Sequence, residues 1–145
     1  MNWIESKWRE RESRGEDGIY FPSDEVVELC GSPSAGYQAD LPAPVLLLLR
    51  GAPEGWRALS EICVAESEGL MVRAGAGEGE GSGFVALEEC ASGRLRWLLY
   101  LNESEAFVQV ELGDFTVRAF SGEGTRWFKW VIPVDTPELF KVHLV

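Results

Sequence analysis

The sequence contains few of the side chains that build metal centres and catalytic dyads. Its 145 residues include one histidine, His143, and three cysteines, at positions 30, 63 and 90. There is no Cys-x-x-Cys pair, and a zinc site would need ligands drawn from the whole length of the chain. A lone histidine with no cysteine or acidic pair beside it also provides no activated nucleophile. We therefore expect no catalytic residues, no metal site and no cofactor.

Long apolar runs are absent as well. The longest aliphatic run, Val45–Leu49, is far too short to cross a bilayer. It lies between Pro44 and Gly51, and its length predicts a strand that is buried on both faces. The first residues are rich in charge and lack the apolar core of a signal peptide. Together with three widely spaced thiols, these features predict a cytoplasmic protein with no membrane association.

Basic residues are scarce relative to acidic ones. The chain has 13 lysines and arginines against 24 aspartates and glutamates, so the formal net charge is −11. Phosphate backbones repel such a chain, and we expect no non-specific nucleic-acid binding. A basic protein partner would instead be attracted, and its association would be accelerated. Arginine outnumbers lysine by ten to three, a bias typical of GC-rich bacterial genomes.

The most regular part of the chain runs from Phe84 to Val134 and consists of short apolar stretches separated by turn residues. At its centre, Gly113-Asp114 separates two such stretches, as in a two-residue type II′ hairpin turn. Side chains alternate between the two faces of a strand, so this turn predicts one wholly apolar face. The cross-strand pairs expected on that face are Leu112 with Phe115, Val110 with Val117, and Val108 with Ala119.

The opposite face of this hairpin has a mixed composition. Aromatic and arginine side chains are concentrated at the energetic centres of protein interfaces, and this face combines both types. The neighbouring strand adds one more of each. The candidate partner-binding residues are Phe107, Gln109, Arg118, Phe120, Arg96 and Tyr100. The alternative is that an N-terminal helix covers this face through Trp3 and Trp8.

Acidic residues are concentrated between Glu54 and Glu89. This quarter of the chain holds eight acidic and two basic residues, which gives a net charge of −6 out of −11. Such a surface could cover the basic site of a protein partner, whereas the alternative is an ordinary solvated hairpin face. The candidate acidic patch consists of Glu61, Glu66, Glu68, Glu78, Glu80 and Glu88.

We predict a mainly β fold, either an antiparallel meander in a two-layer sandwich or an open barrel, with one N-terminal α-helix. The helix is expected within residues 1–15, where Ile4 and Trp8 lie four residues apart on one face. A chain of this length can bury a core of its own, so a single domain over residues 1–145 is expected.

Strands and turns are expected to form the rest of the molecule. Segments rich in glycine, proline and serine indicate loops. Residues 23–30 fit a strand or a helix equally well, and residues 56–65 also fit both, with a strand preferred. The expected organisation is strands over 16–83 with long loops at 31–44 and 75–83, followed by an antiparallel meander over 84–145.

The functional expectation follows from the missing catalytic groups and from the acidity. We expect a non-enzymatic bacterial protein that binds and neutralises or regulates a protein partner, which the charge predicts to be basic. Small size, acidity and the lack of catalytic motifs are typical of immunity proteins against secreted toxins. The alternative is a β-barrel or sandwich that binds a small ligand in a pocket lined by Trp97, Trp127 and Trp130. An enzyme with an undetected acid pair comes third, and the oligomeric state is left open.

Overall fold

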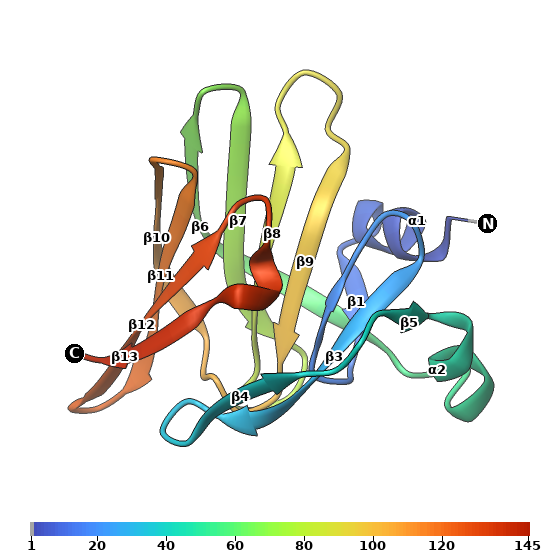
Figure 1. Ribbon diagram of the computed structural model, residues 1–145, viewed down its shortest axis with the longest axis horizontal. Coiled ribbons are helices and arrows are strands. Elements are labelled where there is room, and N and C mark those ends of the chain that lie inside the picture. Colours follow the sequence, from blue (N-terminus) through green and yellow to red (C-terminus); the bar gives the residue numbers. More distant parts are fainter. Residues whose placement is uncertain (1) are drawn as a thin grey trace.

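Antiparallel strands dominate the computed structural model, which describes residues 2–145 (Figure 1). Strands make up 56% of the chain, which confirms the mainly β fold predicted from the sequence. The helices are α1 (Trp3–Arg9), α2 (Leu46–Gly51) and the 3-10 helix η1 (Pro137–Leu139). The strands are β1 (Glu12–Arg14), β2 (Gly18–Tyr20), β3 (Glu25–Ser32), β4 (Gly36–Ala39), β5 (Ala43–Pro44), β6 (Trp56–Ser67), β7 (Leu70–Gly77), β8 (Gly83–Glu89), β9 (Leu95–Leu101), β10 (Phe107–Gly113), β11 (Thr116–Glu123), β12 (Arg126–Pro133) and β13 (Lys141–Leu144).

The strands form two sheets that pack around a shared apolar core. The larger sheet has nine strands in the order β1-β6-β7-β8-β9-β2-β3-β4, with β5 paired to β3, and the smaller has the order β10-β11-β12-β13. Leu87 and Trp97 from the larger sheet meet Val117 and Trp130 from the smaller one. Over the described residues the strands do not close into a barrel. Within the same part of the chain, no helix has the length and apolarity that a membrane span requires.

Strands at the centre of the larger sheet are buried on both faces. Val85 and Leu87 of β8 belong to the core between the sheets, whereas Phe84 and Ala86 belong to a second apolar cluster with α1. Figure 1 shows α1 on the side of this sheet that faces away from β10–β13. A strand that is covered on both faces carries apolar side chains at successive positions. This burial explains the uninterrupted apolar sequence of β8 and β9.

Helix α1 is shorter than the helix predicted for residues 1–15, of which residue 1 lies outside the described range. The chain leaves the helical conformation at Arg11, whose φ is 58°. Residues 12–14 then form β1, which pairs with β6. The prediction is therefore wrong after Arg9. Trp8 is buried, and its Nε1–H donates a hydrogen bond of 2.7 Å to Glu88.

The aliphatic run Val45–Leu49 does not form the buried strand predicted for it. Residues 46–51 form α2, and within the run only Val45 is fully buried. The side chain of Leu47 is 57% exposed. Leucine has a high helix propensity, and four successive leucines outweigh the single β-branched residue before them. Composition and length alone therefore pointed to the wrong element.

The predicted loop at 31–44 is largely strand, and the predicted loop at 75–83 is shorter than expected. Strand β3 continues to Ser32, and β4 and β5 occupy much of the remainder of 31–44. In the glycine-rich segment 75–83, β7 continues to Gly77 and β8 begins at Gly83, so only residues 78–82 connect them. Of the two ambiguous segments, 23–30 contributes to β3 and 56–65 lies within β6. Glycine and proline content overestimated the loops because this sheet accepts glycine inside its strands.

The central hairpin forms, but its register differs from the prediction. Asp114 and Phe115 are the two turn residues, with φ values of 52° and 57°, so the turn is of type I′ rather than II′. Leu112 therefore pairs with Val117, and Val110 pairs with Ala119. A β-bulge between Phe107 and Gln109 then exchanges two side chains between the faces. As a result, Phe107 is buried and Val108 is 43% exposed, the reverse of the prediction.

Candidate functional site

The predicted partner-binding residues do not form one surface. The bulge in β10 turns the ring of Phe107 into the core, where it packs against Trp130 at a centroid distance of 5.4 Å. Tyr100 is also buried, in the apolar cluster that contains α1. Burial therefore removes Phe107 and Tyr100 from the candidate partner surface.

The other four candidates lie in two places. Gln109, Arg118 and Phe120 share the outer face of the smaller sheet, and Gln109 pairs directly with Phe120. Helix α1 packs on the larger sheet and does not cover them. Arg96 lies on β9 and forms an ion pair of 3.2 Å with Asp135. The proposed competition between the N-terminal helix and a partner for one face therefore does not arise.

Two members of the predicted acidic patch have structural contacts instead. Glu88 is buried and accepts hydrogen bonds from Trp8 Nε1, at 2.7 Å, and from Arg73 Nε, at 2.6 Å. Arg73 also donates to Glu61 at 2.8 Å. The hydrogen bond to Glu61, which has the largest effect, and the hydrogen bond to Glu88 both raise the pKa of Arg73. The trio of Arg73, Glu61 and Glu88 thus joins α1 to the larger sheet.

The other four carboxylates of the predicted patch lie at opposite ends of one strand. Glu66 and Glu68 are at the β6–β7 turn, whereas Glu78 and Glu80 are at the β7–β8 connection. Strand β7 has eight residues, so the two pairs are separated by about 25 Å. These side chains are exposed and solvated. A continuous acidic patch is therefore not formed.

The tryptophans proposed for a ligand pocket are not gathered around one. Trp97 and Trp130 are buried in the core, and their ring N–H groups donate to Val134 O and Ser121 Oγ, each at 2.8 Å. Trp127 lies on the outer face of the smaller sheet, on the strand face opposite Trp130. Two of the three rings therefore fill the space between the sheets.

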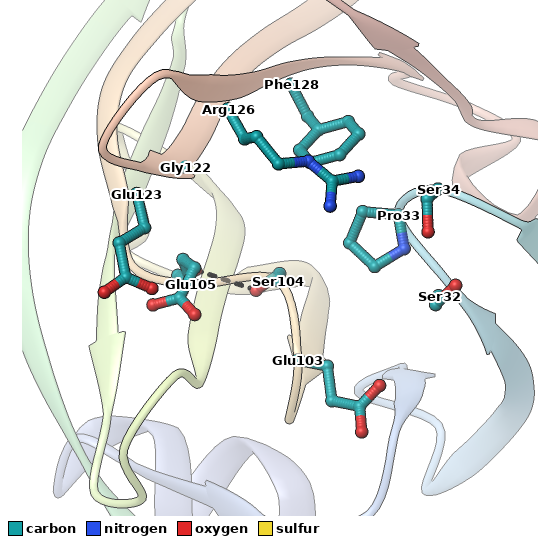
Figure 2. Close-up of a pocket in the computed structure, with 10 residues that line it drawn as sticks. All are labelled: Ser32, Pro33, Ser34, Glu103, Ser104, Glu105, Gly122, Glu123, Arg126 and Phe128. Atoms are coloured by element: carbon teal, nitrogen blue, oxygen red, sulfur yellow. Dashed lines mark hydrogen bonds between the residues drawn. The ribbon is translucent and has the colours of Figure 1, made fainter.

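A polar cleft of about 310 Å³ opens where three turns meet (Figure 2). Figure 2 shows the guanidinium of Arg126 directed into this cleft, with Glu105 and Glu123 on one side. The same guanidinium lies 5.7 Å from the ring centroid of Phe128. The lining residues are Ser32, Pro33, Ser34, Glu103, Ser104, Glu105, Gly122, Glu123, Arg126 and Phe128.

The polar side chains of this cleft can form hydrogen bonds and ion pairs with a bound molecule. A carboxyl group that serves as a general acid needs apolar surroundings, whereas Glu103 and Glu123 are exposed to solvent. The hydroxyl of Ser104 donates to its neighbour's backbone oxygen, Glu105 O, at 2.8 Å. Among the residues drawn in Figure 2 there is no histidine or lysine to activate a serine. Within residues 2–145, no three metal-ligating side chains cluster around one point.

A larger and more apolar groove lies between the β3–β5 segment and η1. Its volume is about 530 Å³. The apolar lining includes Phe21, Val27, Leu41 and Leu139, and four carboxylates surround it. We call this feature the acid-rimmed groove, and its lining residues are Phe21, Ser23, Glu25, Val27, Ala39, Asp40, Leu41, Pro42, Asp135, Glu138 and Leu139.

Proline residues shape both walls of the acid-rimmed groove. Pro42 keeps Leu41 extended and has no N–H for strand pairing, so residues 41 and 42 run between β4 and β5 without joining a ladder. The side chain of Leu41 is 87% exposed. On the other wall, Pro137 begins η1, a position that proline favours, and Leu139 ends it with 63% exposure. The local backbone thus presents two leucines to solvent.

The rim of the groove keeps a negative charge. Its four carboxylates belong to Glu25, Asp40, Asp135 and Glu138, and Arg96 pairs with Asp135. Among the described residues, the other three carboxylates make no ion pair. Four negative charges and one positive charge leave a net −3 around an apolar floor. Exposed apolar surface within a charged rim is the composition of a protein-binding site.

Comparison of the chain with protein-family models, curated proteins and solved structures gives no match. Sequence reasoning missed the acid-rimmed groove, because its walls come from residues 21–27, 39–42 and 135–139. The one local indication of the groove in the sequence was Asp40-Leu41-Pro42. Here a leucine follows an acidic residue and precedes a proline, which disfavours a buried strand.

Proposed function

We propose that this protein is a non-enzymatic binding module whose acid-rimmed groove holds a cationic, amphipathic segment of another protein. The observation that carries the proposal is the exposure of Leu41 and Leu139 on opposite walls of a groove rimmed by four carboxylates. Apolar side chains of the partner would displace water from the two leucines. Lysine or arginine side chains flanking them would pair with Asp40, Glu25 and Glu138.

The charge of the whole molecule supports a basic partner. A net charge of −11 attracts a cationic protein over distances longer than any single contact, and it raises the association rate at low salt. The groove then adds short-range selection, because a partner that has charge but no apolar side chain gains nothing from Leu41 and Leu139. Steering and selection thus come from different parts of the structure.

We further propose that binding neutralises or regulates the partner. We infer a bacterial, cytoplasmic protein that covers a basic functional surface of its target, as immunity proteins do with secreted toxins. The support is compositional: the chain is small and acidic, and the groove is open enough to receive a segment of another protein. Genes that neighbour its own are the first place to seek the partner.

The test uses two synthetic peptides of equal positive charge, one with leucines between its lysines and one with serines instead. Titration calorimetry should show that the protein prefers the leucine peptide by roughly tenfold or more. The Leu41→Ser/Leu139→Ser variant should lose this preference and keep the weaker, salt-sensitive binding of both peptides. The Asp40→Asn/Glu138→Gln variant should bind both peptides more weakly.

A matched control separates the groove from general acidity. Glu54→Gln/Glu68→Gln removes the same two charges from exposed positions outside the groove. This control should weaken binding much less than Asp40→Asn/Glu138→Gln. Equal binding of the two peptides by the wild type, or equal losses in the two charge variants, would show that only net charge is recognised.

The partner itself can be sought with the same variants. Affinity capture from the host is expected to recover a basic protein with the wild type and to lose it with Leu41→Ser/Leu139→Ser. Capture of the same protein by both forms would place the interface outside the acid-rimmed groove.

A further inference from the structure

The outer face of the smaller sheet carries a cluster of positive charge on an otherwise acidic molecule. Strand register places Arg118, Lys129, Lys141 and His143 on this face, the side away from the core. Two of the three lysines in the chain are therefore here. Glu111, which pairs with Arg118 in the ladder, is the one acidic side chain that the register places on this face.

These cations are not neutralised by neighbouring carboxylates. Within residues 2–145, Arg118, Lys129 and Lys141 form no ion pair, Arg118 included despite its position opposite Glu111. By contrast, Arg14, Arg73 and other arginines of the larger sheet are paired. A local cationic surface can attract an anion even on a chain of opposite net charge, because solvent ions screen charges beyond about 10 Å.

Two aromatic rings lie among these cations. Phe120 pairs directly with Lys129, and Trp127 on the next strand occupies the diagonal position. The indole of Trp127 lies over Gly122, where a Cβ atom would collide with the ring, and its Nε1–H donates to Gly124 O at 2.9 Å. One face of the indole therefore covers the glycine backbone, and the residue as a whole stays partly exposed.

A shallow depression brings Phe120 together with Lys129 and His143. It has a volume of about 490 Å³ and is lined by Phe120, Lys129, His143, Leu144 and Val145. An aromatic ring, an ammonium group and an imidazole thus meet in one recess. Facing side chains on neighbouring strands are about 5 Å apart, and diagonal ones about 7 to 8 Å. This spacing is close to the repeat of an extended nucleotide chain.

We infer that this face binds single-stranded nucleic acid, with bases on Phe120 and Trp127 and phosphates beside Lys129, Lys141 and Arg118. Each nucleotide carries both a flat aromatic base and a negative charge, so a single strand complements both kinds of side chain. An acidic peptide would satisfy the cations and leave the two rings without a partner. The two aromatic rings therefore favour a nucleic acid over an acidic protein.

This inference departs from the expectation that the net charge gave, because net charge describes the whole molecule and not one face. It is independent of the proposed function. The nucleic-acid face lies on β10–β13, whereas the acid-rimmed groove is formed by the β3–β5 segment and residues around η1. Leu41→Ser/Leu139→Ser should therefore leave nucleic-acid binding unchanged, and failure of one proposal does not imply failure of the other.

The test is fluorescence anisotropy with labelled oligothymidylate and oligouridylate of about 12 nucleotides. We expect binding at about 50 mM salt that weakens as salt increases. Phe120→Leu and Trp127→Leu keep an apolar side chain but remove the ring, and each should weaken binding by roughly 5- to 100-fold. Lys129→Gln/Lys141→Gln changes only the charge of two sheet-surface side chains and should weaken binding while leaving thermal unfolding unchanged.

Controls distinguish this surface from a general anion-binding face. Arg9→Gln/Arg50→Gln removes two exposed positive charges from α1 and α2 and should have little effect. Phe120→Tyr keeps a ring and should retain binding. No binding of either oligonucleotide would overturn the inference. Equal affinity for an oligoglutamate peptide, with no loss in Phe120→Leu or Trp127→Leu, would assign the face to acidic proteins instead.

Discussion

At the scale of single residues, Phe115 is a bulky aromatic residue in a backbone conformation that favours glycine. It has a φ of 57°, the left-handed region, and its ring is 75% exposed at the tip of the β10–β11 hairpin. The second position of a type I′ turn favours glycine, because a Cβ atom is crowded there. The ring has no burial to offset this cost, so Phe115 lowers the stability of the hairpin.

Phe115→Gly is therefore expected to stabilise the protein. The gain should be about 1 kcal/mol in the free energy of unfolding, since the residue is relieved of left-handed strain. Urea denaturation of the wild type and the variant measures this difference. Thr116→Gly at the next position, which is in a strand, should be destabilising. A lower midpoint for Phe115→Gly would mean that the ring has a stabilising contact absent from the structure.

The burial of single residues could be predicted where apolar and polar side chains alternate along a strand without interruption. Val110, Val117 and Ala119 were predicted to be core residues, and they are buried. Phe107 was assigned to the wrong face because one bulge inverts the alternation, and a bulge leaves no mark in the apolar pattern. The turn type was also predicted wrongly. The preference of glycine for turns placed Gly113 inside the turn, which is formed instead by Asp114 and Phe115.

At the scale of elements, α1 depends on contacts made by distant residues. Its seven residues are too few for a stable isolated helix. Asp24 accepts hydrogen bonds from the backbone N–H groups of Trp3, at 3.2 Å, and Ile4, at 3.0 Å. The carboxylate of Glu5 accepts from the N–H of Leu95 at 3.0 Å. The first turn is thus capped by Asp24, which lies 20 and 21 positions away from the two residues whose N–H groups donate to it.

Asp24→Ala is expected to destabilise the protein by about 2 kcal/mol, because it removes this cap and places alanine at a φ of 66°. Asp24→Asn keeps an oxygen acceptor and tolerates the left-handed region, so its loss should be about half as large. Chemical denaturation gives both values. The neighbouring exposed residue supplies a control, since Glu25→Ala should change stability little. Equal stability of the Ala variant and the wild type would show that the cap does not support α1.

Element type was predictable wherever alternation or a strong turn was present. The strands β8 to β12 were expected from their sequence and are observed. They do not form the single meander that was predicted, because β8 and β9 belong to the larger sheet and β10–β13 to the smaller one. The run Val45–Leu49 was assigned to a strand although it starts a helix, because periodicity cannot separate these states in five residues. The cap of α1 by Asp24 could not be predicted locally, since it depends on which strands become neighbours.

At the scale of the whole molecule, two tyrosines link folding to high pH. Burial is the main cause that raises the pKa of Tyr20 well above its ordinary value of 10.0, and burial also raises the pKa of Tyr37. The folded state therefore favours the neutral phenols. Their contribution to stability is complete below the unfolded pKa near 10 and is lost as the pH rises through the folded pKa values.

The free energy of unfolding should consequently fall above about pH 10. Denaturant midpoints measured between neutral pH and about pH 11 test this dependence, with tyrosinate absorbance followed in parallel. Tyr37→Phe should reduce the dependence, because its phenol oxygen is buried without a hydrogen-bond partner. A stability that is unchanged up to about pH 11 would contradict burial of these hydroxyls.

The candidate site belongs to this largest scale, which explains why the sequence did not reveal it. Its leucines, Leu41 and Leu139, are almost a hundred positions apart and meet only because the two sheets pack together. The acidic residues predicted as a patch are close in sequence but are separated by the length of β7. The net charge predicts only the charge of a partner, whereas the place where a partner would bind depends on the topology.

The acid-rimmed groove is tested most directly by NMR titration of the isotopically labelled protein with the leucine–lysine peptide. The account predicts that chemical-shift changes concentrate at Phe21, Val27, residues 39–42 and residues 135–139, and that Leu41→Ser/Leu139→Ser removes them. Shift changes spread over the acidic turns at residues 66–68, 78–80 and 103–105, with the groove unaffected, would contradict it.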